Sequence, residues 1–410
     1  MRIMPSKNNN HQASLMLHLP LMMLPLMASY VALRQSKSDL PFLNDLSPGI
    51  MPEPLANLQK AWRELKNNPN LAVAVHEEAK NRLIDLLSTV EKYRQSEFTR
   101  NVTGEPQIVC NIGNARLLDY GATHQETSVV LLVPSLINRY YILDLSEKRS
   151  FARYLRNCGF RVFIVDWQSP GELENNFNCS QYITEILVPF AEFICQNTSG
   201  KINISGYCMG GLFAVAAAQI RPDLFDSLAL FATPWNFFSE NFPHFAMNEG
   251  EIAALGEYID NSQGLSPENI NLLFHYANPY AFRDKLREFD YNARNSDEDF
   301  AAIEHWSNDG VAMSKAVARD CLINWTQYNS PAAGKWRVGG QIVDAEKLDL
   351  PCFAAIPKED KIVPSDCALP LAELLKDCTI VMPHSGHVGM MIGKNGKTST
   401  WESFAKWLRQ

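Results

Sequence analysis

The sequence predicts an α/β fold with a doubly wound, mostly parallel sheet. After about residue 106 the chain alternates short β-branched runs with segments that have helical periodicity. Runs without polar alternation are typical of parallel strands that are buried on both faces. The predicted strands are SVVLLVP, RVFIVDW, KINISG, SLALFA, PCFAAIP and CTIVM.

Helical segments connect these strands. SQYITEILVPFAEFICQN precedes KINISG, GLFAVAAAQIR follows it, and CALPLAELLKD follows PCFAAIP. Each can cross over the sheet and return the chain parallel to the previous strand. Before the sheet, residues 54–94 carry apolar residues at spacings of three and four, which predicts a helical region. We therefore divide the chain into an apolar and helical N-terminal region, 1–100, and a sheet-containing domain, 101–410.

The composition indicates a globular protein and argues against a nucleic-acid binder. The 410 residues include 37 basic and 45 acidic side chains, which leave a net charge of −8, and 46% are hydrophobic. A chain with a net negative charge does not attract a polyanion such as nucleic acid, and the apolar share is enough for a large core. Nine cysteines are scattered without CxxC pairs. They predict neither a disulfide framework nor a zinc site and favour a reducing compartment.

Residues 13–33, ASLMLHLPLMMLPLMASYVAL, form an uncharged apolar run. The run is longer than the apolar part of a secretory signal, and no A-x-A cleavage site follows it. Its length just reaches that of a spanning helix, but Pro20, Pro25 and His18 weaken that interpretation. We expect a cytoplasmic protein whose apolar segment lies on a hydrophobic surface such as a membrane, or packs against a partner chain.

The segment Ser205–Gly211, SGYCMGG, connects a predicted strand to a predicted helix. It has the G-x-nucleophile-x-G pattern of the sharp elbow in α/β-hydrolase folds. Glycines are needed there because the central residue is strained and the strand and helix approach closely. Cys208 is thereby predicted to stand clear of the sheet at a helix N-terminus, which favours its thiolate. The alternative is a buried structural cysteine in a glycine-containing turn.

A nucleophilic thiol needs a base and a group that orients the base, in the chain order nucleophile, acid, histidine. Asp360 follows the predicted strand PCFAAIP, which is the expected place for the acid. In PHSGHVG we favour His387 over His384 as the base, because Gly386 and the glycine-rich loop let its ring reach an open site. The alternatives are a solvated carboxylate and a histidine that only caps a loop. Three other carboxylates compete for the role of the acid: Asp166, Asp309 and Asp366.

Two backbone N–H groups are predicted to form an oxyanion hole. The first belongs to Met209, directly after the nucleophile. The second comes from the loop after SVVLLVP, where we choose Leu136. Asn138, Arg139 and the two tyrosines of that loop are equally suited to holding it rigid.

Several motifs together resemble the polyhydroxyalkanoate synthases, PhaC-like enzymes of the α/β-hydrolase fold that polymerise 3-hydroxyacyl-CoA into storage polyester. They occur in family order within residues 105–410: PSLINRYYILDL, VFIVDWQSPGE, GYCMGG, HWSNDG, KEDKIVP and SGHVG. The resemblance implies that Cys208 carries the growing acyl chain, that His387 activates it, and that Asp360 assists at the histidine or the incoming hydroxyl. It implies (R)-3-hydroxyacyl-CoA as the substrate and a granule surface as a partner. We expect no metal or other cofactor, and a homodimer is one of the open oligomeric states.

Three departures limit this resemblance. Lys361 stands where the family often has histidine, and Ser135 replaces a second proline after Pro134. The region through about residue 100 does not resemble that of the long synthases. The core chemistry is compatible with all three departures, whereas the range of substrates is not implied.

A cysteine nucleophile suits this reaction because acyl-CoA is itself a thioester. Transfer to Cys208 exchanges one thioester for another and keeps the acyl group activated for the next hydroxyl. A serine ester would lose that activation. The residue type therefore favours acyl transfer over hydrolysis, with the exclusion of water deciding between them.

About a hundred residues separate Ala232 from Gly334, far more than an ordinary crossover, which predicts an inserted cap over residues 233–335. Its aromatic side chains either line an apolar acyl channel or form the core of the cap. We name Trp235, Phe237 and Trp306 as candidates for substrate binding. The other aromatic residues are Phe238, Phe242, Phe245, Phe274, Tyr276, Tyr280 and Phe282.

Three classes of function stay open on the sequence alone. The first is a polyhydroxyalkanoate synthase, the second is a hydrolase of thioesters or of the polymer, and the third is a non-catalytic granule protein. We favour the first, because a nucleophile, an acid and a base are all present.

Overall fold

The computed structural model describes residues 60–61, 64–65, 67–96, 104–122, 128–198, 200–242, 246–277 and 298–410, together with Met23. The chain divides into two compact units, Met1–Glu97 with Asn278–Asp297, and Phe98–Ala277 with Glu298–Gln410. The apolar run over residues 13–33 lies, apart from Met23, outside the described residues. Its predicted role at a granule or membrane surface therefore stays a prediction.

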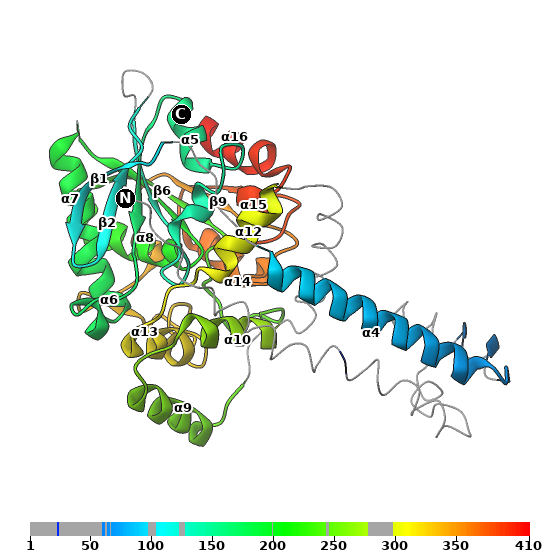
Figure 1. Cartoon of the computed structure of the whole chain (residues 1–410). Helices are drawn as coiled ribbons and strands as arrows, with labels where there is room; N and C mark the ends of the chain where they lie inside the picture. Colours follow the sequence, from blue (N-terminus) through cyan, green and yellow to red (C-terminus); the bar gives the residue numbers. More distant parts are fainter. Residues whose placement is uncertain are drawn as a thin grey trace. The chain divides into compact units, whose positions relative to one another are not determined.

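Helix α4, Leu71–Gln95, is the main described element of the first unit (Figure 1). It confirms the helical periodicity over the second half of residues 54–94. Its surface carries acid–base pairs one turn apart, each of which stabilises an exposed helix by about 0.2–0.5 kcal/mol. The pairs are Glu77–Lys80, Glu78–Arg82 and Glu91–Arg94.

No helix in the described part of the chain combines the length and apolar character needed to cross a bilayer.

The second unit is built on an eight-stranded sheet with the order β1-β2-β4-β3-β5-β6-β9-β10. The strands from β4 to β10 are parallel to one another, which confirms the predicted doubly wound, mostly parallel sheet. All six of them coincide with runs predicted from the sequence. They are β3 Val129–Val133, β4 Arg161–Asp166, β5 Ile202–Tyr207, β6 Phe225–Phe231, β9 Cys352–Ala355 and β10 Cys378–Val381.

A hairpin that was not predicted extends one edge of the sheet. It consists of β1, Gln107–Ile112, and β2, Ala115–Asp119, and β2 runs antiparallel to β4. Gly113 and Asn114 form its turn, with Gly113 at a φ of +55°. A two-residue Gly-Asn turn is a recognised hairpin signal. The strand before it is partly exposed and mixes polar with apolar residues, so it lacks the apolar run that identified the central strands.

Side chains of the central strand β3 point alternately into two apolar layers. Leu131 belongs to the layer that includes α7, Val188–Asn197, and α8, Met209–Ile220. Leu132 belongs to the layer that includes α5, Phe151–Asn157, and α16, Glu402–Trp407. Figure 1 shows these two pairs of helices on opposite sides of the sheet. Because both faces are covered, the strand has no polar alternation.

The chain between β6 and β9 forms several helices in place of one crossover. They are α9 Glu249–Asn261, α10 Pro267–Ala277, α12 Glu298–Asn308, α13 Lys315–Arg319 and the π-helix η4 Asp320–Trp325. A small sheet of β7, Arg337–Val338, and β8, Gln341–Ile342, follows them and was not predicted. We call residues 233–335 the insertion. The remaining helices are η1 Tyr140–Leu143, η2 Glu174–Asn176, α6 Cys179–Gln181, η3 Tyr182–Leu187, η5 Ala345–Lys347, α14 Ser365–Leu374, α15 Gly389–Ile392 and η6 Lys397–Trp401.

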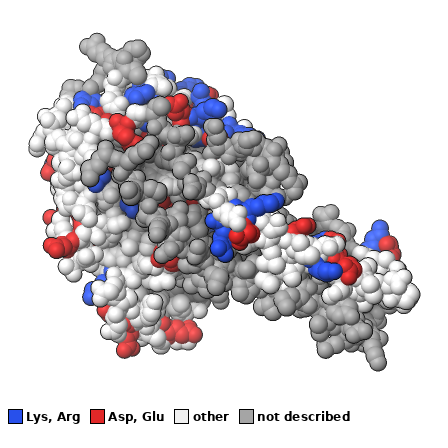
Figure 2. Space-filling model, in the orientation of Figure 1, with Lys and Arg blue, Asp and Glu red and all other residues white. Residues whose placement is uncertain are grey.

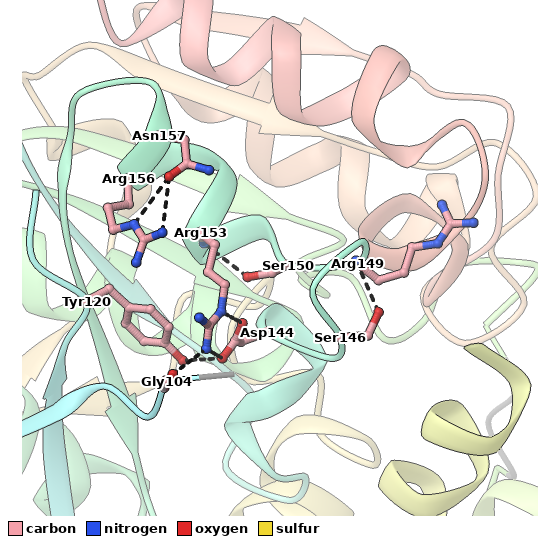
Figure 3. A network of polar contacts seen from close by, with 9 residues as sticks. All are labelled: Gly104, Tyr120, Asp144, Ser146, Arg149, Ser150, Arg153, Arg156 and Asn157. Carbon is pink, nitrogen blue, oxygen red and sulfur yellow. Dashed lines mark hydrogen bonds and ion pairs between the residues drawn. The ribbon is translucent and has the colours of Figure 1, made fainter. Parts of the chain in front are cut away.

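A buried ion pair fixes the end of the loop that follows β3 (Figure 3). The Asp144 side chain is fully buried and accepts hydrogen bonds from Arg153 Nε at 2.8 Å and from the Tyr120 hydroxyl at 2.9 Å. Arg153 also donates to the Gly104 carbonyl at 2.8 Å, and Ser150 caps the N-terminus of α5. The loop is thereby tied, through the buried Asp144 carboxylate, to Arg153 of α5 and to Tyr120, the residue after β2.

We expect Asp144→Asn to lower the free energy of unfolding by roughly 3 kcal/mol, because it leaves the poorly exposed Arg153 guanidinium without its counter-charge. Asp223→Asn is the matched control, since Asp223 pairs with Arg221 at the surface with 61% of its side chain exposed. Surface pairs of that kind contribute at most about 1 kcal/mol. Urea denaturation followed by circular dichroism measures both values, and equal effects would contradict the importance of the buried pair.

Candidate active site

Cys208 lies at a sharp bend between the end of β5 and the start of α8. Its backbone has a φ of +55° and a ψ of −125°, a conformation that is strained for a residue with a side chain. The Cys208 N–H donates to the Phe231 carbonyl at 2.8 Å, and the Cys208 carbonyl accepts from the Gly211 N–H at 2.9 Å. The bend therefore has the geometry that the sequence predicts for this turn.

Three glycines make the bend possible. A Cβ atom on Gly206 would clash with the backbone of Gly211, and one on Gly210 would clash with the carbonyl oxygens at the end of β3. A Cβ atom on Gly211 would collide with the Thr233 side chain. Strand β5, helix α8 and the loop after β3 thus approach more closely than a residue with a side chain at these three positions would permit.

Asp360 lies in the loop after β9 and is held at both of its oxygens. Its Oδ1 accepts hydrogen bonds from the backbone N–H groups of Ile362 and Val363, each at 2.8 Å. Its Oδ2 lies 2.7 Å from Nδ1 of His387. The carboxylate side chain is fully buried, so the pair is oriented by the loop and shielded from solvent.

His387 is held from two further directions. The Tyr207 hydroxyl donates to the His387 carbonyl at 3.2 Å, and the two rings lie 5.2 Å apart at an angle of 34°. Tyr207 is the residue before Cys208, so the strand that carries the thiol also holds the histidine loop. Since Nδ1 is bound to Asp360, Nε2 is the ring nitrogen available to Cys208. Sequence reasoning missed this tyrosine, although its place beside the nucleophile was a usable signal.

The pKa of His387 is set by burial and by its two neighbours, Cys208 and Asp360. Burial by itself lowers the pKa, because it disfavours the charged ring. The charges of Cys208 and Asp360, with hydrogen bonds to both, outweigh burial and raise the pKa from 6.5 to about 10. A pKa of about 10 means that the imidazole carries a proton at neutral pH.

The competing residues have other partners. His384 is exposed, and its Nε2 lies 3.4 Å from Nζ of Lys358. Asp366 accepts hydrogen bonds from the backbone and the side chain of Asn241, at 3.0 and 3.1 Å. Asp166 binds Gln168, and Asp309 binds the loop after β3. Of the candidate acids and bases, the structure brings together Asp360 and His387, while their catalytic roles stay predictions.

The loop after β3 lies against the bend, as an oxyanion hole requires. Trp167 Nε1 donates to the Pro134 carbonyl at 3.0 Å, and that carbonyl packs on Gly210. Leu136, two residues later, is buried. Outside the helices and strands of the described residues, no backbone hydrogen bond uses the Leu136 N–H, and Met209 is the first residue of α8, where a helix supplies no acceptor for the N–H. Both are therefore available to a ligand, and the oxyanion role of each stays a prediction.

The predicted substrate-binding aromatics are packed against one another and against the core. Trp235 and Phe237 are buried in the layer that includes α8. The Phe237 ring lies 5.2 Å from that of Phe242 and 6.3 Å from that of Trp325. Trp306 Nε1 donates to a carbonyl of the loop after β3. This packing favours a core of the insertion over a channel lining. Phe238 is exposed, and Phe245, Tyr280, Phe282 and the side chains of Phe274 and Tyr276 lie outside the described residues.

Cys208 has apolar neighbours on two sides. It packs against one cluster that contains Tyr207, Met390 and Trp306, and against another that contains Ile356 and Val363. Cys208 itself is partly exposed, so these side chains cover only part of its surroundings. In the described ranges no group of three or more His, Cys, Asp or Glu could hold a metal ion. The expected lack of a cofactor stays a prediction.

Comparison with known proteins places these observations in a family. Residues 128–394 match the alpha/beta hydrolase fold family, and residues 76–155 match the family of poly-beta-hydroxybutyrate polymerase (PhaC) N-termini. The second match begins before residue 100, so the prediction that the region through about residue 100 does not resemble the synthases is wrong for its last part. A thermophilic esterase from Thermogutta terrifontis is similar in structure, with a TM-score of 0.48 and 17% identity over 75% of this chain and 97% of the esterase.

Three curated relatives are named as the PhaC subunit of a poly(3-hydroxyalkanoate) polymerase. The protein of Haloferax mediterranei is 25% identical over 80% of this chain and 68% of its own length. The protein of Haloarcula marismortui is 25% identical over 69% and 61%, and that of Thiocystis violacea is 24% identical over 71% and 82%. The chain thus spans between about three fifths and four fifths of these relatives.

We expect the protonated state of His387 to depend on the two groups that raise its pKa. In the wild-type protein its ring should stay protonated through neutral pH and titrate near 10. Cys208→Ala and Asp360→Asn should each lower that value, because each removes or weakens an interaction that raises the pKa of His387. Cys110→Ala, a partly exposed cysteine of β1, should not. Histidine-selective NMR, with His387→Gln to assign the signal, measures the titration.

The raised pKa of His387 also makes the stability of the folded protein depend on pH. A folded-state pKa above the unfolded value of 6.5 stabilises the folded protein fully below pH 6.5. This contribution is lost as the pH rises through about 10. A wild-type His387 that titrates near 6.5 would contradict the geometry described for the site.

Proposed function

The chain belongs to the alpha/beta hydrolase fold family and is a PhaC-like member of it, and on that premise we propose that it is a polyhydroxyalkanoate synthase. It transfers (R)-3-hydroxyacyl groups from CoA to a growing polyester and releases CoA. The observation that carries the proposal is a cysteine, in place of serine, at the strained bend beside a buried Asp360–His387 pair. The curated relatives, named as polymerase subunits, support the same activity.

The first step proposed is transfer of the acyl group to the enzyme. The Cys208 thiolate attacks the thioester carbonyl, and the oxyanion that forms accepts hydrogen bonds from the N–H groups of Met209 and Leu136. A bond from carbon to the Cys208 sulfur replaces the bond from carbon to the CoA sulfur. The protonated His387 gives its Nε2 proton to the leaving CoA thiolate, which departs as a thiol.

The second step transfers the acyl group to a hydroxyl. The now neutral His387 removes the proton from the hydroxyl of another 3-hydroxyacyl unit, and its oxygen attacks the Cys208 thioester. The new ester bond replaces the bond to sulfur, and the sulfur leaves as a thiolate beside the re-formed imidazolium. Asp360 stabilises that imidazolium and keeps Nε2 directed at the reacting atoms.

Apolar packing around Cys208 supports transfer over hydrolysis. Water and a hydroxyl compete for the same acyl-enzyme, so the product depends on which of them reaches the thioester. The clusters on either side of the sulfur are made of carbon-rich side chains, which disfavour ordered water. Attachment to a granule through residues 13–33 and the formation of a homodimer are further proposals, drawn from the sequence.

Purified protein mixed with (R)-3-hydroxybutyryl-CoA should release CoA thiol and form insoluble polymer. Cys208→Ala should abolish both, a loss of roughly 10⁶-fold, because no covalent intermediate can form. Cys110→Ala is the control and should keep the wild-type rate. Thiol titration, light scattering and mass spectrometry of the acylated Cys208 peptide provide the measurements.

Each other outcome identifies a different function. Release of CoA with free hydroxy acid and no polymer would identify a thioesterase. Activity that survives in Cys208→Ala would exclude the proposed mechanism. A wild-type protein that binds polymer granules but releases no CoA would be a non-catalytic granule protein.

The choice of acid and base can be tested separately. Asp360→Asn should slow CoA release by about 10⁴-fold, because the imidazolium loses its counter-charge and its orientation. His387→Gln should be slowed at least as much. Asp366→Asn and His384→Gln are the matched controls and should stay near the wild-type rate. If either control were slowed more than its partner, the assignment of that role would be wrong.

A further inference from the structure

One carboxylate of the insertion binds two side chains of the loop that carries Leu136. Oδ1 of Asp309 lies 3.2 Å from Nε of Arg139, and Oδ2 accepts a hydrogen bond from the Tyr141 hydroxyl at 2.8 Å. Arg139 and Tyr141 belong to the loop after β3, about 170 residues earlier in the chain. One side chain of the insertion therefore holds two side chains of the loop.

Backbone groups join the same two segments. The Val311 N–H donates to the Ile137 carbonyl at 3.2 Å, and Asn138 pairs with Gly310 in an isolated antiparallel bridge. Trp306 Nε1 donates to the Arg139 carbonyl at 2.9 Å. The segment that follows Leu136 is thus bound at consecutive residues to the end of α12 and the residues after it. We call these contacts, together with the Asp309 contacts, the clamp.

Several contacts hold the loop, including one from Arg139 to the Ser169 hydroxyl at 3.4 Å, and the clamp lies next to Leu136 on its C-terminal side. Trp167 and Gly210 fix Pro134 before it. The Asp144–Arg153 pair fixes the far end, as Figure 3 shows. The middle, from Ile137 to Tyr141, is bound to the insertion. The direction of the Leu136 N–H therefore depends on an element outside the sheet.

We propose that Asp309 is a positioning residue for the oxyanion hole: through Arg139 and Tyr141 it holds the Leu136 N–H where the oxyanion of the acyl-transfer step forms. The inference rests on the proposed function, since it requires acyl transfer to Cys208. Asp309 acts through the loop and is not itself a catalytic group. The Asp309 side chain is 38% exposed and the Arg139 side chain 19% exposed. Removing the Asp309 charge should therefore change the alignment of the loop more than the packing of the core.

Two reagents that attack the same sulfur separate positioning from general damage. Iodoacetamide alkylates Cys208 by displacement at a saturated carbon: a carbon–sulfur bond forms and iodide leaves, with no oxyanion. Acylation by (R)-3-hydroxybutyryl-CoA, or by p-nitrophenyl acetate as a simpler ester, passes through an oxyanion and needs the donor N–H groups. A misplaced Leu136 should therefore slow acylation and leave alkylation unchanged.

We expect Asp309→Asn to slow acylation about 10- to 100-fold, less than the loss of a whole oxyanion donor. The fall should be in kcat, with KM little changed, because the interaction is made in the transition state. Alkylation of Cys208 should keep its wild-type rate. Asp309→Glu keeps the carboxylate and should recover part of the acylation rate.

The matched control is Asp260→Asn. Asp260 lies on α9 of the insertion, pairs with Arg319 and has 59% of its side chain exposed. Figure 2 shows that acidic side chains are exposed over α9, at the lower end of the view. The control removes a carboxylate–guanidinium pair of the same type that does not reach the loop, and both reactions should stay at the wild-type rate.

A double-mutant cycle tests whether Asp309 acts through Arg139. Arg139→Gln should slow acylation, and the double variant should be no slower than the slower single variant, since each change breaks the same clamp. Full additivity would mean that the two residues act independently and would overturn the inference. So would wild-type acylation by Asp309→Asn, or a loss of alkylation equal to the loss of acylation. Failure of the wild-type protein to acylate Cys208 would instead overturn the proposed function, and this inference with it.

Discussion

The close approach of α8 to β5 and to the loop after β3 is the constraint on which the site depends. Gly206, Gly210 and Gly211 stand where any Cβ atom would strike a neighbour. That crowding holds Cys208 at a positive φ and places its sulfur at the start of a helix. It also brings the carbonyls at the end of β3 against the same turn. The nucleophile and both predicted oxyanion donors therefore come from segments that meet at one point.

Much of this arrangement could be predicted because its signals are local. The apolar runs marked the six parallel strands, and the glycine pattern marked the bend at Cys208. Asp360 was predicted by its place after a strand, and the structure indeed brings it to His387. The preference for His387 over His384 rested on a weak local signal. Contacts between residues distant in sequence distinguish the two histidines. Tyr207 binds the backbone of His387, and Asp360 binds its ring.

Long-range pairing accounts for what the sequence analysis missed. The β1–β2 hairpin has a readable turn, yet its exposed strand lacks the apolar run of a buried one. Asp309 was considered as a catalytic acid, and only the fold shows that it binds Arg139 instead. The motifs around Arg139 and Asp309 were each recognised, but nothing in either indicates that they meet. The cap aromatics were likewise left between two interpretations, because composition does not say which faces of the rings are covered.

The hydrogen bond from Tyr207 to the His387 loop makes the thiol and the imidazole parts of one frame of strand ends. The predicted oxyanion donor, on the loop after β3, is instead held both by the sheet and by the insertion. Thermal motion of the insertion would therefore alter how well a carbonyl is polarised without drawing the proton donor away from the sulfur. Motion of the insertion would then change the rate of acyl transfer and leave the acid–base chemistry unchanged. The pH dependence of the rate would therefore not depend on that motion.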